Sequence, residues 1–165
     1  MNISIKELGT LAKDTEKETA SYLEKLKKKP PKQLDYLMQD LHDAVFKRVN
    51  CLDCANCCKT TGPLFTDADV ERLSKFLKMK PAAFEAQYLR VDEEGDKVLK
   101  QVPCAFLADD NHCLVYEVRP KACREYPHTD RKKFYQINKL TMLNRSICPA
   151  AYEVVEALKK KIPQP

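Results

Sequence analysis

The spacing of apolar residues predicts a helical N-terminal segment. In residues 3–28, Leu8, Leu11, Tyr22, Leu26 and two threonines recur at steps of three or four, with Lys and Glu elsewhere. This period is typical of an amphipathic helix. Two prolines end the pattern at 30 and 31, and a similar pattern in residues 32–49 predicts a second helix. A short Pro turn between two helices favours an antiparallel hairpin.

The middle of the chain carries local start signals. Thr66 is followed by early carboxylates, which predicts that a helix begins there with a Thr cap. Pro81 fits the first position of a further helix. Residues 89–91 and 97–99 are rich in Val and Leu and flank an acidic turn with Gly95. This pattern predicts a β-hairpin, because Gly tolerates the positive φ of a tight turn.

From Pro103 onward the pattern predicts mostly loops. A short helix is expected from Arg119 to Arg124, and a last helix after Cys148 with its apolar face at 152, 155, 158 and 162. Residues 130–145 are left open between strand and helix. We therefore expect an α-rich fold with a small β-hairpin, in which an N-terminal helical pair (1–49) packs on a loop-rich, metal-stapled cysteine domain (50–165). The two segments are expected to form one folding unit.

Composition narrows the class of protein. The 165 residues suffice for one domain with a sizeable core. The net charge of +5 lies largely in short Lys/Arg runs, and two of these end predicted helices, where cations favour the helix dipole. We interpret them as solvated helix ends rather than a nucleic-acid surface. The charged N-terminus and the lack of a long apolar run predict a cytoplasmic protein without a membrane segment.

Cysteine chemistry changes the picture most. In a reducing compartment, clustered thiols favour a bound metal over disulfides. Gaps of two residues let successive sulfurs point at one centre, as in zinc knuckles and in iron–sulfur runs. Folding must return the later cysteines to the early cluster. We predict all eight cysteines as metal ligands: Cys51, Cys54, Cys57 and Cys58 within eight residues, then Cys104, Cys113, Cys123 and Cys148.

The metal itself is left open between an iron–sulfur cluster and zinc. Eight thiolates suit two four-coordinate sites, or one cluster with spare ligands. A C-x2-C-x2-C run completed by a remote Cys-Pro resembles bacterial ferredoxins, and Cys148 with Pro149 supplies that pair, which favours a 4Fe–4S cluster. Four cysteines also bind Zn²⁺ tetrahedrally. Because Cys57 and Cys58 are adjacent, we expect them to face different metals or to bridge.

Arginine and histidine side chains near the cysteines are candidates to stabilise or bind the metal centre. A centre with four thiolates carries about two negative charges by formal counting and needs donors or cations beside its ligands. Arg119 and Arg124 are predicted to fill this role. His112 and His128 are alternative ligands, although the thiol count already satisfies two sites. His42 is interpreted as a helix-surface residue.

The motifs resemble a family of zinc- or iron-chelating domains. Residues 51–58 match its CxxCxxCC signature in full, and residues 65–69, 104–107, 113–120, 123–127 and 148–149 resemble its later motifs in order. The resemblance covers residues 50–158, with one departure at Ala105, where we expect Pro; it should alter only loop stiffness. It implies metal chelation. Related domains resemble part of flagellin lysine methylases, for which an iron–sulfur centre is expected, and members are often called iron–sulfur oxidoreductases.

Three functions are compatible with these observations. The first is a metal-binding protein with a redox or metal-handling role. The second is a metal-dependent enzyme with an open coordination position, although Asp53, Glu117, Glu125 and His128 show no recognisable catalytic spacing and catalytic residues stay unknown. The third is a zinc-stapled interaction module, whose protein partner is unidentified.

Overall fold

The computed structural model describes residues 3–163 and shows a mostly helical protein. Helices account for 60% of the chain, with a small three-stranded antiparallel sheet, which confirms the predicted fold class. The chain forms two compact units: unit 1 comprises residues 3–50 and 127–163, and unit 2 comprises Cys51–Tyr126. The domain assignment made from the sequence stays a prediction. None of the described helices combines the length and apolar character that crossing a bilayer requires.

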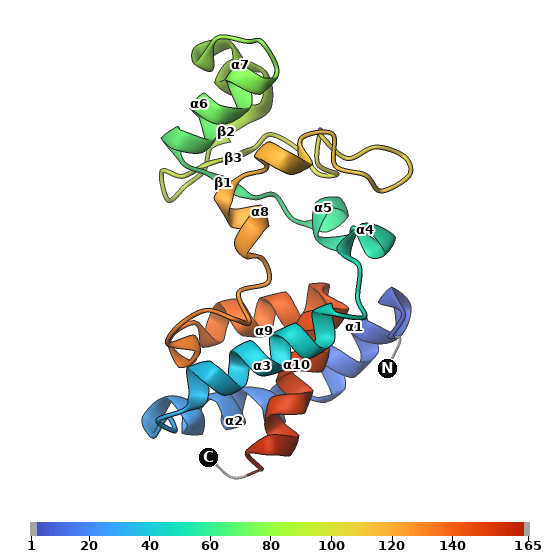
Figure 1. Cartoon of the computed structure of the whole chain (residues 1–165), viewed down its shortest axis with the longest axis vertical. Helices are drawn as coiled ribbons and strands as arrows, with labels where there is room; N and C mark the ends of the chain where they lie inside the picture. Colours follow the sequence, from blue (N-terminus) through green and yellow to red (C-terminus); the bar gives the residue numbers. More distant parts are fainter. Residues whose placement is uncertain (1–2, 164–165) are drawn as a thin grey trace. The chain divides into compact units, whose positions relative to one another are not determined.

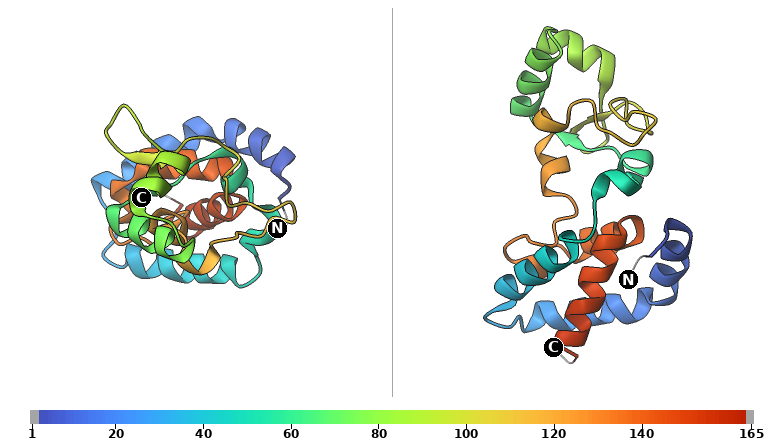
Figure 2. Two further views of the ribbon diagram at one scale, coloured as in Figure 1. Left: turned by 90° about the horizontal axis from the view of Figure 1, so that it is seen from above. Right: turned by 45° about the vertical axis from the view of Figure 1, so that its right-hand side comes forward.

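Unit 1 is a bundle of helices with α10 at its centre. Helix α10 packs on α3, α9 and α1, and α2 packs on α9 (Figures 1 and 2). Tyr22, Met38 and Val155 belong to its buried core. Its helices are α1 (Ile5–Asp14), α2 (Glu16–Lys28), α3 (Leu34–Phe46), the 3-10 helix η2 (Phe134–Gln136), α9 (Asn138–Ile147) and α10 (Pro149–Lys161).

The predicted helix over residues 3–28 is interrupted at Thr15, which separates α1 from α2. The Thr15 hydroxyl donates a hydrogen bond to the carbonyl of Leu11 at 2.7 Å. Arg145 of α9, only 1% exposed, donates to the carbonyl of Ala12 at 3.0 Å and to Oγ1 of Thr15 at 2.5 Å. A buried guanidinium thus satisfies a carbonyl at the end of α1 that helical hydrogen bonding leaves open.

Residues 130–145, which the sequence left open, begin as turn and coil up to Lys133 and then form η2 and most of α9. Buried Asn138 donates to the carbonyl of Leu23 at 3.0 Å. His42 lies on α3, where its Nδ1 is 2.8 Å from Oγ1 of Thr129 and its ring stacks on Phe46 at 4.3 Å. The N-terminal helices therefore pack on α9 and α10, which come from the C-terminal part of the predicted cysteine domain.

Unit 2 combines short helices with a three-stranded sheet of order β1-β3-β2. Strands β2 and β3 pair antiparallel with Leu89 opposite Leu99, which confirms the predicted hairpin. The two-residue strand β1 was not predicted, because it is too short to show a periodic pattern. The elements are α4 (Cys51–Cys54), α5 (Asn56–Thr60), β1 (Leu64–Phe65), α6 (Asp67–Phe76), α7 (Pro81–Tyr88), β2 (Leu89–Val91), β3 (Lys97–Leu99), the 3-10 helix η1 (Tyr116–Val118) and α8 (Lys121–Glu125).

Local start signals in unit 2 gave correct boundaries. Oγ1 of Thr66 accepts from the backbone N–H of Asp69 at 3.2 Å, and the Asp69 carboxylate accepts from the Thr66 N–H at 3.0 Å. This reciprocal capping box confirms the predicted Thr cap. Pro81 opens α7, as predicted. The cysteine run is helical in α4 and α5, which are joined by Ala55.

Phe84→Ala is expected to destabilise unit 2 by about 3–5 kcal/mol, because removing a buried aromatic ring leaves a cavity. Phe84 is 0% exposed, and its ring lies 5.2 Å from that of Tyr88 and 6.2 Å from that of Phe106. Denaturant unfolding measures the change. Phe76→Ala, at a side chain that is 50% exposed, is the control, with an expected change within about 0.5 kcal/mol. Equal losses from both variants would contradict this packing.

Candidate metal centre

Seven of the eight cysteines lie in unit 2, and none of the eight, all within the described residues, forms a disulfide. Helices α4 and α5 carry four of them, the loop before η1 carries two, and α8 carries one. Cys148 belongs to unit 1, where its Sγ accepts from the backbone N–H of Ala151 at 3.4 Å at the start of α10. Its role as an eighth ligand stays a prediction.

A tight turn between α4 and α5 sets the early cysteines. Buried Ala55 joins the two helices at φ 48°, in the left-handed region. That conformation costs a non-glycine residue about 1–2 kcal/mol, so the surrounding contacts must hold it. The ammonium of Lys59 donates to the carbonyl of Cys54 at 3.1 Å across this turn. The turn lets Cys54 and Cys57 lie on consecutive short helices.

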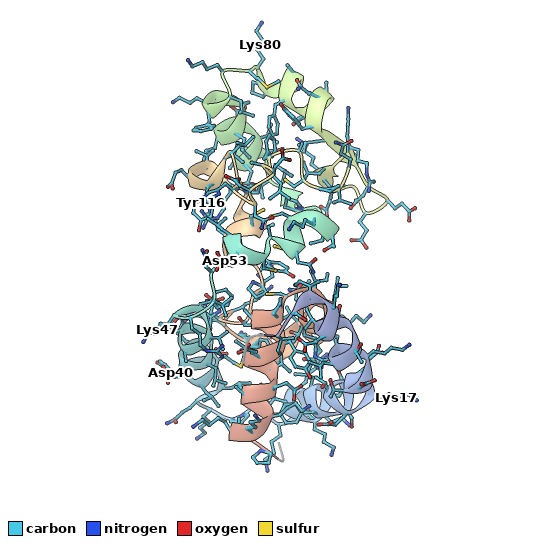
Figure 3. All side chains as sticks on the ribbon, turned by 90° about the vertical axis from the view of Figure 1, so that its right-hand side faces the viewer. Lys17, Asp40, Lys47, Asp53, Lys80 and Tyr116 are labelled. Atoms are coloured by element: carbon cyan, nitrogen blue, oxygen red, sulfur yellow. The ribbon has the colours of Figure 1, made fainter. Side chains whose placement is uncertain are left out.

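Backbone contacts hold the later loop against α4 and α5. The N–H of Cys104 donates to the carbonyl of Cys58 at 2.8 Å. Nδ2 of Asn111 donates to the carbonyl of Asp53 at 3.4 Å. A β-bridge between Leu107 and Cys113 closes the loop on itself. Figure 3 labels Asp53 on α4 and Tyr116 on η1 in this part of unit 2.

The thiols of unit 2 influence one another electrostatically, with Cys58 at the centre. A hydrogen bond with Cys57, followed by burial, raises the pKa of Cys58. Burial raises the pKa of Cys123 to about 12, and the charges of other thiols add to the rise. Burial likewise raises the pKa of Cys51, Cys104 and Cys113, and in each case the charge of Cys58 contributes.

These thiols have the chemistry of a metal-binding donor set. Without a cation they are held protonated, because burial and mutual repulsion disfavour the thiolate. A bound metal reverses this balance, since it stabilises several thiolates at once. Within residues 3–163, no three side chains of Cys, His, Asp or Glu are arranged to hold one ion as they stand. The types of donor and their gathering in unit 2 nevertheless fit a metal bound by thiolates.

The charge of Arg119, one of the two predicted arginines, acts on several thiols of unit 2. The guanidinium of Arg119 opposes the pKa rise that burial causes at Cys51, Cys113 and Cys123. It lies 3.8 Å above the ring of Tyr116 and donates from Nη1 to the Tyr116 carbonyl at 2.7 Å. Arg124 is exposed on α8, and its place beside the metal stays a prediction.

The candidate histidine ligands lie in different units. His112 is exposed in unit 2, where its Nδ1 is 3.2 Å from a carboxylate oxygen of Asp110. His128 belongs to unit 1 and has φ 64°. The candidate acid–base residues Asp53, Glu117 and Glu125 are exposed in unit 2.

Asp69 is a buried residue of unit 2 that the sequence identified only as an early carboxylate of a helix. It is 1% exposed and accepts a hydrogen bond from the backbone N–H of Lys121 at 3.0 Å. It also pairs with Arg72 at 2.5 Å. The contact joins α6 to the start of α8, the helix that carries Cys123. No local pattern reveals it, because the partners are 52 residues apart.

The pKa of Asp69 predicts a specific acid sensitivity. Burial raises this pKa, but hydrogen bonds from Thr66, Arg72 and Lys121 outweigh burial and lower it overall. The stabilisation is therefore present above the unfolded-state pKa of about 3.9 and is lost as pH falls through the folded-state value. The measurement is the unfolding free energy of metal-free wild type minus that of metal-free Asp69→Asn. This difference should be constant from about pH 5 to 7 and shrink below about pH 4. An excess that persists to pH 2 would contradict this.

The protein is mostly helical and has seven free thiols in one unit. These features define a cysteine-cluster metal-binding domain. Residues 50–148 match the CxxCxxCC family model, described as "Putative zinc- or iron-chelating domain", and the chain belongs to this family. The predicted resemblance is thereby confirmed, and the matched region contains all eight cysteines. Comparisons with curated proteins and with solved structures give no match.

Proposed function

We propose that unit 2 binds an iron–sulfur cluster through its cysteine thiolates and serves in electron transfer or in redox support of a partner reaction. The observation that carries the proposal is that α4, α5, the loop before η1 and α8 bring seven cysteines into unit 2, where the N–H of Cys104 donates to the carbonyl of Cys58 at 2.8 Å. The spacing of Cys51, Cys54 and Cys57 supports iron, because C-x2-C-x2-C is the bacterial iron–sulfur run. When bound, such a cluster supplies one-electron redox chemistry.

The surrounding residues suit this role. Cys104 and Cys113 pack against the apolar core of unit 2, which includes Phe84 and Phe106. A low-dielectric wall strengthens the field of nearby charges on the thiolates. The charge of Arg119 acts on Cys113 and Cys123, and such a cation would offset part of the negative charge of a thiolate-bound centre.

Metal and sulfide analysis on protein purified without air tests the proposal. We expect brown protein with broad visible absorption and acid-labile sulfide in proportion to iron. Colourless protein with stoichiometric zinc and no sulfide would overturn the redox function. It would favour the second candidate, a zinc-stapled domain, which the tetrahedral preference of Zn²⁺ for four cysteines supports.

A further inference from the structure

Unit 1 joins two basic segments that are far apart in the sequence. Residues 27–35 run from the end of α2 into the first turn of α3, and residues 130–133 precede η2. The backbone N–H of Lys133 donates to the carboxylate of Asp35 at 2.9 Å, and η2 packs on both α2 and α3 (Figures 1 and 2). We call the exposed side chains of these two segments the basic surface.

The net positive charge of the chain is concentrated on the basic surface. Its two segments contain seven Lys or Arg and two Asp, so their net charge is +5, which equals that of the whole chain. The other residues are therefore neutral in sum. The seven cations, at 27–29, 32 and 131–133, are exposed, and no ion pair within residues 3–163 includes any of them. Such cations repel one another, and a bound polyanion would relieve that repulsion.

The fold holds the second segment firmly against the first. Lys133 has φ 56°, in the left-handed region that residues other than glycine seldom adopt. The Asp35 carboxylate accepts its N–H, and the next residue, Phe134, is buried in the same core as Leu26 and Leu34. These contacts keep the cations at 131–133 beside the start of α3.

An aromatic ring is exposed in the first turn of α3. Tyr36 follows Asp35 and is 78% exposed, more than any other large apolar side chain in residues 3–163. The other exposed large apolar side chains described in unit 1, Ile5 and Leu143, belong to α1 and α9. One ring suffices to stack on a base, whereas a protein interface or insertion into a membrane needs a wider apolar area. Lys is also depleted in protein–protein interfaces.

We propose that the basic surface of unit 1 binds single-stranded nucleic acid, with its cations on phosphates and Tyr36 stacked on an unpaired base. In a duplex the bases cover one another's faces, so a single strand is the form that offers a face to this ring. Phosphate contacts and stacking read no base edges, so binding should depend little on sequence. The sequence alone favours solvated helix ends, because each basic run is short. The fold joins two runs and adds the ring, and the proposal is independent of the metal in unit 2.

The test measures binding of a fluorescent oligothymidylate to full-length protein purified without air, by anisotropy between about 50 and 200 mM salt. Affinity should fall steeply as salt rises. If about four to seven cations contact phosphates, the slope of log K against log salt should be about −3 to −5, because each contact with a single strand contributes about −0.7.

The variant Lys32→Gln with Lys132→Gln removes one cation from each segment and should make this slope shallower by about 1.4. The matched control is Lys13→Gln with Lys17→Gln, which removes the same charge from exposed lysines of α1 and α2 outside the basic surface. The control should keep the wild-type slope. Equal changes in both variants would overturn the proposal, because they would show a general effect of net charge.

The stacking contact has a separate readout. Tyr36→Ala should weaken oligothymidylate binding by roughly fivefold or more and leave the salt slope unchanged, because the lost contact carries no charge. Tyr36→Phe keeps the ring and should bind as wild type does. The side chain is largely exposed, so both variants should unfold at the wild-type temperature. Wild-type affinity in Tyr36→Ala would contradict a stacked base.

Competing polyanions decide between classes of partner. We expect oligothymidylate to bind more tightly than a duplex of equal length, polyaspartate or vesicles that contain phosphatidylserine. Tighter binding of polyaspartate would overturn the proposal in favour of an acidic protein surface, and tighter binding of the vesicles would overturn it in favour of a membrane. No binding of oligothymidylate at about 50 mM salt would overturn it outright.

Discussion

Cys58→Ala is expected to lower metal affinity by more than about 100-fold and to leave anaerobically purified protein almost free of metal. Losing a ligand should cost more than the 10- to 100-fold typical of groups beside the ligands. Cys58 is the most damaging position, because its charge acts on Cys51, Cys104, Cys113 and Cys123. Metal content per chain, by elemental analysis, is the measurement.

Thr60→Ala is the control for this variant, because Thr60 lies exposed on the same short helix. It should retain wild-type metal content. Full metal content in Cys58→Ala would contradict the central place of this thiol. The same measurement on Cys148→Ser tests the eighth predicted ligand separately: wild-type content there would make that prediction wrong and leave the site in unit 2 standing.

Removing the metal with a chelator is expected to destabilise unit 2 selectively. Structural metals bound by cysteines contribute on the order of 10 kcal/mol to the folding of small domains. Much of the 100–120 segment lies outside helices and strands, so few repeating backbone hydrogen bonds hold it. Unit 1 has an apolar core of its own, which includes Leu23, Met38 and Val154. We expect faster hydrogen exchange in residues 51–126, whereas residues 3–50 and 127–163 keep their protection.

Exchange followed by mass spectrometry before and after chelation measures this effect. Metal-free Cys58→Ala is the control, and the chelator should not change its exchange further. Unchanged protection of residues 51–126 after complete removal of metal would show that the unit folds without it. A uniform loss across both units would contradict their separate cores.

Most of the secondary structure was predictable because its signals are local. The Thr66 cap, Pro81 at the start of α7 and the strand pair around Gly95 each depend on residues within a few positions. The break at Thr15 was not predictable, because the contacts that Arg145 makes there come from a distant helix. The two helices of the cysteine run were also not predictable, because the run has too few apolar residues to show a helical period.

Cysteine spacing predicts the thiols as metal ligands, and charge reasoning predicts Arg119 beside them; both stay predictions. The contacts that support the candidate site were not predictable from the sequence. The pair of Asp69 with Arg72 was missed, since its contacts reach residues 46 to 52 positions away. Such contacts depend on how α6 packs in unit 2, and no local propensity encodes that packing.

X-ray absorption at the metal edge, on full-length protein purified without air, tests the central claim most directly. The account predicts that the atoms nearest the metal are sulfur, with distances of about 2.3 Å as in thiolate-bound zinc. Additional iron neighbours would identify a cluster. Nearest neighbours that are nitrogen or oxygen, or protein that holds no metal, would contradict a centre built from the thiols of unit 2.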